Sequence, residues 1–384
     1  MSVRTLSDLV FRIRDIASGR SDLLSSSTGG RREVLSTADF LRDIHSLALA
    51  LKARDVRRGH RIAIFSGNRP EWHVADFACQ LLGAHTVPVS SSLSAQQVGF
   101  ILRNSACHWV FYDTRAKYEL LASLESSLTS PPALVAFAAE AASEGGLTIT
   151  RLIGDGAARQ GDVPIERFRG VVGENDTASL IFLQGADGEP ERASVRHLDL
   201  MTEVSRQNEK LELSLSDRAV AGLPLAHGLQ RTVDHVCFLR GVAIHYPASK
   251  DEMAETLARE RPNLLTASSE IYGQLFEQAK EAADRRRPLP RWLFYRAVSL
   301  SRRHAAARQT GAVGPLLALQ RKVVSLLVFR QIHRRLGGCL RHAICQGPPV
   351  GSEVHRFFAE IGVPIEVAED VPPVEISADV EPPL

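Results

Sequence analysis

Strand-length apolar segments alternate along this chain with amphipathic segments of helical length. Between residues 36 and 54, apolar side chains recur at helical spacing behind Ser36 and Thr37, which predicts a capped helix. Helices are also expected from residue 68 to a stop at Gly83 and over residues 94–104. Strands are expected at residues 61–65, 86–89, 108–112, 219–223, 242–246, 264–267 and 340–345. Because parallel strands are joined by helical crossovers, this order predicts an α/β fold with parallel sheets and flanking helices.

Composition limits the classes of protein to which the chain can belong. With 384 residues, 44% of them hydrophobic, it can bury a core large enough for two joined lobes. Its five cysteines are scattered without a CxxC pair, which favours buried thiols of a reducing compartment and predicts no metal site. Residues 1–19 lack the apolar centre of a signal peptide, and the longest apolar runs fall short of the roughly 20 residues of a membrane span. A cytoplasmic location is therefore expected.

A glycine-containing loop over residues 184–192 follows the apolar run at 180–183. Gly185, Gly188 and Pro190 give it the backbone of a phosphate-binding loop, in which N–H groups converge on an anion. The acidic side chains of the loop, however, would repel a triphosphate. An ordinary polar turn between a strand and a helix is the alternative. The acids are Asp187, Glu189 and Glu191.

Two other stretches interrupt the alternation. Residues 138–161 are rich in Ala, Gly and Ser and predict a surface excursion; a Gly-Asp-Gly at 154–156 lacks the third glycine of a dinucleotide fingerprint. Residues 371–384 predict an irregular tail.

Residues 285–335 contain many arginines and no acidic residue. Apolar and aromatic side chains are interleaved with the cations, a pattern that suits anionic lipid headgroups on the inner membrane face. The alternatives are a solvated helical hairpin and, less favoured because no recognition motif accompanies the charge, a nucleic-acid surface; we expect no nucleic-acid partner. The candidate membrane-surface residues are Arg302, Arg303, Arg321 and Lys322.

Seven segments, in this order, resemble the adenylate-forming (AMP-binding) superfamily, most of all the long-chain fatty-acid:CoA ligases (acyl-CoA synthetases). They lie at residues 35–40, 56–64, 68–72, 83–89, 223–232, 261–267 and 336–341. The resemblance covers residues 5–370. It implies the large N-terminal domain of such enzymes, with a first lobe at about 5–235 and a second at about 236–370 that includes the basic helical insert 285–335.

Members of this family use Mg-ATP to activate a carboxylic acid as an acyl-adenylate, and then transfer the acyl group to coenzyme A. Their phosphate loop ends in Gly-x-Pro-Lys-Gly, which aligns with residues 188–192. The remnant here consists of Gly185, Gly188 and Pro190, with Glu191 in the place of the lysine and Arg192 as a partial substitute cation.

The other nucleotide motifs of the family are reduced as well. In the adenine-side turn only Gly347 and Pro349 match, and the run that should carry a magnesium-binding glutamate reads Ala-Glu-Asp-Val-Pro-Pro at 368–373. No small C-terminal lid domain precedes Leu384. The resemblance therefore predicts no intact catalytic site and no tight binding of ATP, magnesium or coenzyme A.

His227 follows Leu-Pro-Leu-Ala at 223–226, where the family's histidine borders the acyl pocket. The alternative is a helix-start residue bonded to the backbone. Three functions stay open. One is an impaired or inactive ligase homologue, a pseudoenzyme that retains an acyl groove. The second is a working ligase whose lid is supplied by another polypeptide. The third is a noncatalytic acyl-chain-binding or membrane-surface scaffold protein.

Overall fold

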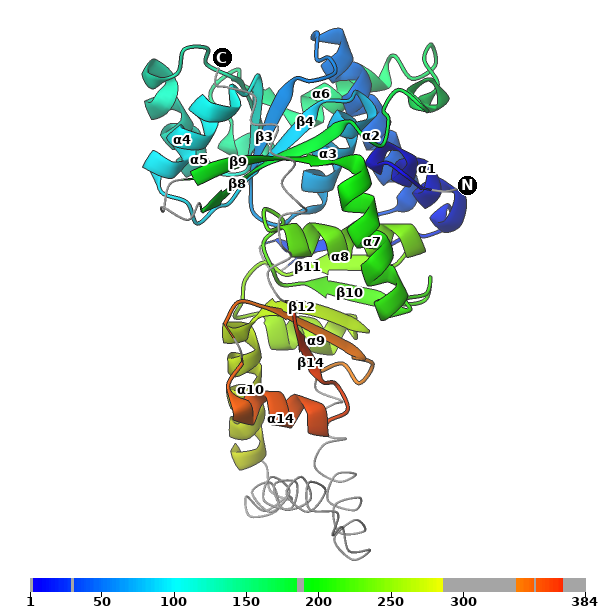
Figure 1. Ribbon diagram of the computed structural model, residues 1–384, viewed down its shortest axis with the longest axis vertical. Coiled ribbons are helices and arrows are strands. Elements are labelled where there is room, and N and C mark those ends of the chain that lie inside the picture. The colour runs from blue at the N-terminus through cyan, green and yellow to red at the C-terminus, as the bar shows by residue number, and fades with distance from the viewer. Residues whose placement is uncertain (1–2, 29–30, 185–189, 286–335, 349, 369–384) are drawn as a thin grey trace, which may run out of the picture. The chain divides into compact units, whose positions relative to one another are not determined.

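The computed structural model describes residues 3–28, 31–184, 190–285, 336–348 and 350–368 (Figure 1). The expected α/β class is confirmed. Among the described residues, two compact units share the chain: the first contains those up to 215 and those at 224–246, and the second contains 216–223 and those from 247 to 368. The expected lobes at 5–235 and 236–370 stay predictions. The two units do not divide the chain at one point, because residues 216–223 lie in the second unit and residues 224–246 return to the first.

The first unit contains a seven-stranded sheet in the order β7-β6-β5-β3-β4-β8-β9. All its neighbouring strands are parallel except β8 and β9, which are antiparallel. The strands are β3 (Arg61–Phe65), β4 (His85–Val89), β5 (Trp109–Tyr112), β6 (Ala133–Ala136), β7 (Leu147–Thr148), β8 (Thr177–Gln184) and β9 (Pro190–Arg196).

Helices of this unit begin where the sequence provides caps. Ser36 caps α2 (Thr37–Ala53) by accepting a hydrogen bond from the Asp39 amide, and Ser94 forms a capping box at α4 (Ala95–Ser105). Pro70 occupies the first turn of α3 (Pro70–Leu81), where its missing N–H costs nothing. Helix α5 (Arg115–Leu124) connects β5 to β6 and leads into a short 3₁₀ turn at Glu125–Ser127.

The prediction of a surface excursion at residues 138–161 is wrong. This stretch contains α6 (Ile149–Ala157), which packs against α2 through buried Ile149 and Leu152. Gly156 lies directly against the Ser46 carbonyl, where a Cβ would stand only 1.8 Å from the oxygen. Gly156 therefore serves close helix packing, which composition alone does not distinguish from a loop.

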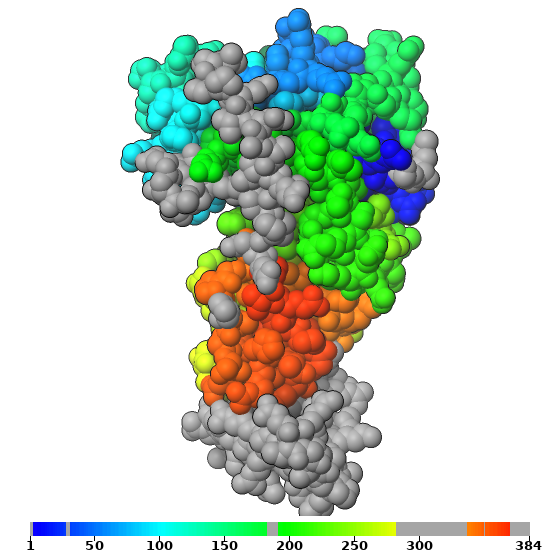
Figure 2. Space-filling model, in the orientation of Figure 1, coloured from blue at the N-terminus to red at the C-terminus, as the bar shows by residue number. Residues whose placement is uncertain are grey.

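A second group of strands and helices completes the first unit. Strand β1 (Leu24–Thr28) pairs in parallel with β11 (Ala243–Tyr246) and antiparallel with β2 (Arg31–Leu35). Helix α8 (Gly228–Arg240) contacts α1 (Leu6–Ala17) and α7 (His197–Leu211). Helix α7 lies at the surface, where it forms part of the green area of the space-filling view (Figure 2). By contrast, every residue of α8 from Leu229 to Phe238 is buried.

The second unit contains four parallel strands in the order β14-β13-β12-β10. Its core lies between this sheet and the helices, where the buried Tyr272 hydroxyl donates to the carbonyl oxygens of Leu265 and Ile344, both at 3.1 Å. The elements are β10 (Arg218–Ala221), β12 (Leu264–Ser268), β13 (His342–Gln346), β14 (Ile365–Val367), α9 (Met253–Glu260), α10 (Ser269–Arg285) and α14 (Ser352–Glu360).

Two predicted regions fall outside the described residues. These are the basic insert, which includes Arg302, Arg303, Arg321 and Lys322, and the tail at 371–384. Within the described part of the chain, no helix combines the length and apolar character needed to span a membrane.

Candidate functional site

The expected phosphate loop lies at the end of the β8–β9 hairpin. Gln184 pairs with Pro190 across the two strands, and the register continues through Leu183 opposite Glu191 and Phe182 opposite Arg192. Gly185 and Gly188 lie outside the described residues. The segment therefore joins two strands, and the alternative of a turn between a strand and a helix is wrong. Ala193 and Val195 alternate as buried residues in β9, which is the strand pattern that the glycine loop obscured.

Glu191 and Arg192 are consecutive in β9, so their side chains point to opposite faces of the sheet. Glu191 is exposed. The Arg192 guanidinium donates from Nη1 to the backbone carbonyl of Asn104 at 3.4 Å, in the last turn of α4. A cation at this end of a helix complements the unpaired carbonyl groups. The cation expected to replace the lysine is thus engaged by α4 in this structure.

The turn expected from the sequence on the adenine side follows β13 in the second unit. Gly347 has φ +106°, a backbone angle that side chains with a Cβ rarely adopt, and the Ala368 amide donates to the Cys345 carbonyl at 2.9 Å. Pro349 lies outside the described residues. Gly347 is therefore required by the shape of the turn, whether or not a nucleotide binds there.

His227 is exposed and occupies the N-cap position of α8 without a side-chain capping bond. Its amide donates to the Pro224 carbonyl at 3.0 Å, and its carbonyl accepts from the Arg231 amide at 3.3 Å. The preceding Leu225 amide donates to Oδ1 of Asn68 at 2.8 Å. Two segments of the family resemblance that are distant in sequence are therefore joined directly beside His227, whose role in an acyl pocket stays a prediction.

A group of polar side chains from α3, α8 and the strands beside them is buried inside the first unit. Arg231 donates from Nη2 to Asp76 at 3.3 Å and to the Ser179 hydroxyl at 3.0 Å. Asp234 contacts His73 Nε2 at 3.0 Å through one carboxylate oxygen, which also accepts from the Tyr246 hydroxyl at 2.8 Å. We call this group the buried polar cluster, and its members are His73, Asp76, Gln80, Ser179, Gln230, Arg231, Asp234, His235 and Tyr246.

The charges of the cluster are arranged to keep some members ionised and others neutral. Burial opposes the ionisation of Asp76, but Arg231 and the other polar neighbours of the carboxyl, among them the Gln80 amide, together outweigh burial and hold its pKa below the usual value. Burial, followed by the nearby Arg231 cation, lowers the pKa of His235 to about 3, so its imidazole is neutral. Burial and the Asp234 carboxylate raise the pKa of Tyr246 well above its usual value.

Sequence reasoning missed this cluster, although a signal was present. His73, Asp76 and Gln80 follow one another at intervals of three and four residues, and on the second helix Asp234 and His235 lie three and four residues after Arg231. Each set shares one face of a helix. Polar residues at this spacing within segments that are otherwise apolar mark a buried polar face rather than a solvated one.

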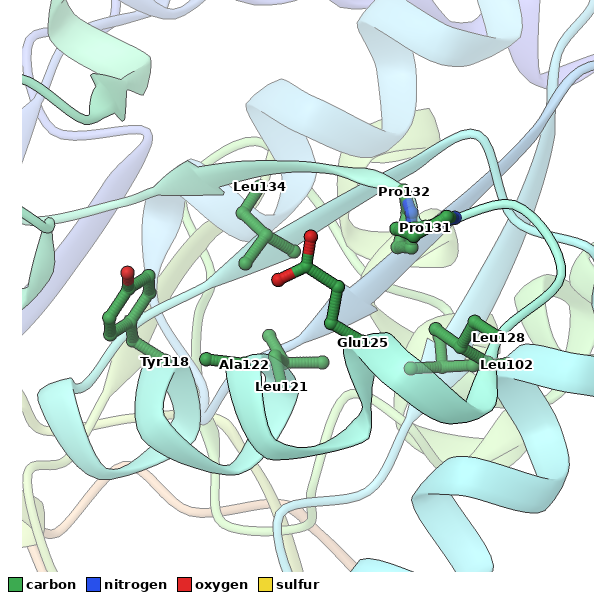
Figure 3. A pocket seen from close by; sticks show the side chains of 9 residues that line it. All are labelled: Leu102, Tyr118, Leu121, Ala122, Glu125, Leu128, Pro131, Pro132 and Leu134. Atoms are coloured by element: carbon green, nitrogen blue, oxygen red, sulfur yellow. The ribbon is translucent and has the colours of Figure 1, made fainter.

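A separate pocket of about 100 Å³ opens between α5, the 3₁₀ turn after it and β6 (Figure 3). Its lining is apolar except for Glu125 and the Tyr118 hydroxyl. Ligand pockets for molecules of cofactor size have roughly 300–1,000 Å³, so this pocket is too small for an acyl-adenylate. The lining residues are Leu102, Tyr118, Leu121, Ala122, Glu125, Leu128, Pro131, Pro132 and Leu134.

A comparison with protein-family models decides the family. The model described as AMP-binding enzyme matches residues 19–369. The chain belongs to the AMP-binding enzyme family. The long-chain-fatty-acid–CoA ligase FadD15 of Mycobacterium bovis is 28% identical over 334 residues, which cover 86% of this chain and 54% of that ligase. Long chain acyl-CoA synthetase 4 of Arabidopsis thaliana is 23% identical over 357 residues, covering 88% and 51%.

Solved structures agree on the fold. The N-terminal domain of FACL13 from Mycobacterium tuberculosis aligns with a TM-score of 0.66 at 16% identity, over 96% of this chain and 76% of that one. This AMP-binding family member spans about half the length of the curated relatives that it matches.

Proposed function

We propose that this AMP-binding family member is an acyl-CoA synthetase-like protein in which ATP-dependent adenylation of fatty acids is impaired. The observation that carries the proposal is the arrangement at the start of β9. Exposed Glu191 occupies the position that aligns with the phosphate-loop lysine, and the neighbouring Arg192 is turned to the other face of the strand and bonded to α4.

The chemistry of adenylation explains why this arrangement matters. Negative charge builds on the phosphates as pyrophosphate leaves, and cations or hydrogen-bond donors must already be in place to stabilise it. A carboxylate at the lysine position repels that charge instead, and Asp187 and Glu189 precede it in the sequence. Each 1.4 kcal/mol of lost transition-state stabilisation lowers the rate about tenfold. The acidic side chains at 187, 189 and 191 therefore do not fit a magnesium–triphosphate group.

A fatty acyl chain remains the proposed ligand. The relatives that match the chain are ligases or synthetases for long-chain fatty acids by name. Binding an acyl chain requires an apolar groove and no phosphate contacts, so it does not depend on the hairpin. We therefore propose a protein that binds an acyl chain without catalysing its adenylation. His227 is the candidate pocket residue.

ATP–pyrophosphate exchange tests the proposal. The purified chain should give background exchange with fatty acids of several chain lengths and no heat of ATP binding in calorimetry, beside a full-length family ligase as positive control. Glu191→Lys should not restore exchange, because Leu183, Gln184, Ala186 and Asp187 still occupy the hydroxyl positions. Glu191→Gln separates loss of a negative charge from gain of a positive one. Robust magnesium-dependent exchange by the unaltered chain would contradict the proposal.

Displacement of a fluorescent fatty acid tests acyl binding separately. The unaltered chain should bind the probe, and His227→Ala should weaken binding several-fold. His355→Ala is the matched control, since His355 is also an exposed helical histidine but lies in α14. Absence of saturable binding would reject the acyl-binding role without restoring a catalytic one.

A further inference from the structure

Two histidines and an aspartate of the buried polar cluster face one another across α3 and α8. His73 and Asp76 are separated by one helical turn on α3, and His235 lies on α8. One potential ligand atom from each lies within 4.8 Å of the others, and all three residues are 0% exposed. A pair of ligands three residues apart on one helix, completed by a ligand from a facing helix, is an arrangement that holds metal ions in helical proteins.

The nitrogens of these histidines lack what buried polar atoms normally have. Within the described residues, neither ring nitrogen of His235 has a hydrogen-bond partner, and neither does Nδ1 of His73. A buried polar atom without a partner destabilises a folded protein, because it has given up its hydrogen bonds to water. His73 Nδ1 and one of the two ring nitrogens of His235 can face the same point, and their lack of partners indicates a missing occupant.

The other nitrogen of His73 is already oriented. Its Nε2 lies 3.0 Å from Oδ2 of Asp234, and that carboxylate is fixed in turn by the Tyr246 hydroxyl at 2.8 Å and by the Gln230 amide at 2.6 Å. A carboxylate that accepts the N–H of a histidine sets the ring orientation and leaves the opposite nitrogen's lone pair for a metal. Asp234 has this relation to His73.

We propose that His73, through Nδ1, together with Asp76 and His235, binds a divalent transition-metal ion, with zinc as the expected occupant. Imidazole and carboxylate ligands suit zinc, and three protein ligands leave one position for water. Zinc ligands at about 2.1 Å stand about 3.4 Å apart in a tetrahedral site, so the side chains need to close by about 1.4 Å at most. The ion would tie α3 to α8 and so act on stability rather than on chemistry.

The charges around the site permit a dication. With both histidines neutral, as metal ligands must be, Asp76 and Asp234 carry two negative charges and Arg231 carries one positive charge. A dication would change the sum of these charges from −1 to +1. Arg231 opposes the ion electrostatically, but it bonds to the Asp76 carboxylate rather than to either histidine.

Metal content measured on the whole chain tests the site. Because the ligands are buried, the chain should be expressed in zinc-supplemented medium, and also refolded from denaturant with zinc chloride, before dialysis and elemental analysis. About one zinc per chain is expected. His235→Gln and His73→Gln should each reduce it at least tenfold, whereas His197→Gln, a change of an equally buried histidine outside the cluster, should not.

Two measurements on the unaltered chain make the test independent of how the variants fold. Replacement of zinc by cobalt should give the visible absorption of a cobalt ion with nitrogen ligands, and zinc should raise the midpoint of thermal unfolding in a concentration-dependent way. If neither route of preparation yields bound metal, the cluster holds a water molecule instead and the proposal is overturned. Binding that survives both His235→Gln and His73→Gln overturns it equally.

Discussion

Arg231 of α8 donates a hydrogen bond to the Asp76 carboxylate of α3 at 3.3 Å, and the two side chains are 4% and 0% exposed. The guanidinium also lies over the Trp72 ring, 5.3 Å from its centroid. Two residues that are 155 positions apart therefore form an ion pair inside the first unit. A pair of this kind contributes less to net stability than to the choice of one packing arrangement, since both charges lose their hydration.

Asp76→Asn should destabilise the first unit by about 3–5 kcal/mol, because it leaves the Arg231 cation buried without a counter-charge. Urea unfolding in the presence of a chelator measures the change. Arg231→Met should have a similar cost for the opposite reason. The double variant should lose much less than the sum of the two, and strict additivity would show that the pair does not act as a unit.

The stability of the folded chain should fall as the pH decreases from about 6.5 to 4, and His197 should account for part of this fall beside His235. Nδ1 of His197 accepts the Leu6 amide at 3.1 Å, and burial lowers the pKa of His197 from 6.5 to about 4. In this pH range the imidazole of His197 is therefore protonated in the unfolded chain but not in the folded chain. The contribution of His197 to the free energy of unfolding is complete above pH 6.5 and is lost as the pH falls toward 4. The loss has a slope of up to about 1.4 kcal/mol per pH unit.

Urea unfolding at a series of pH values checks this expectation. His197→Gln should flatten the slope between pH 6.5 and 4. A high salt concentration should leave the slope largely in place, because burial is not screened as surface charge pairs are. A slope that salt abolishes would assign the effect to the surface instead.

Gly156→Ala should destabilise the chain, because the new methyl group would meet the Ser46 carbonyl and force α6 away from α2. Overpacking of this kind costs about 1–3 kcal/mol or more. Gly154→Ala is the matched control. It lies in the same helix with nothing within 4 Å of the added Cβ, so it should stabilise by up to about 1 kcal/mol. Thermal unfolding of both variants distinguishes helix packing from any other use of these glycines.

Cys339 should react first with a thiol reagent under native conditions. It is partly exposed, whereas the other four cysteines are buried. Burial raises the pKa of Cys107 to about 11 and that of Cys79 well above its usual value, so few thiolates form there. Mass spectrometry of the labelled peptides should find modification at Cys339 before unfolding, and early modification of Cys79 would contradict the described core.

The sequence predicted the parts of the fold that depend on local pattern. The strand at 61–65 and the helix behind Ser36 are found as expected, because apolar periodicity and a hydroxyl cap act within a few residues. The helix at Ile149–Ala157 was not predicted, because the need for a glycine at position 156 arises only from its contact with α2. The pairing of Asp76 with Arg231 could not be predicted either, because it depends on which helices meet.

The candidate site divides in the same way. The altered lysine position was visible in the sequence, but the bond from Arg192 to the Asn104 carbonyl required the structure. The polar faces of α3 and α8 were each readable from spacing. The contact between these two helices, which brings His73 to Asp234, could not be predicted from the sequence.

The pairing of β1 with β11 has a consequence for biosynthesis. Leu24 lies opposite Ile244, so an early strand must wait on the ribosome for a partner that is made about 220 residues later. At 5–20 residues per second this delay lasts roughly 11 to 44 s. During that interval the β1–β2 hairpin has an open edge that can pair with another nascent chain. Nascent chains stalled before Tyr246 should therefore depend on chaperones to a degree that the finished protein does not.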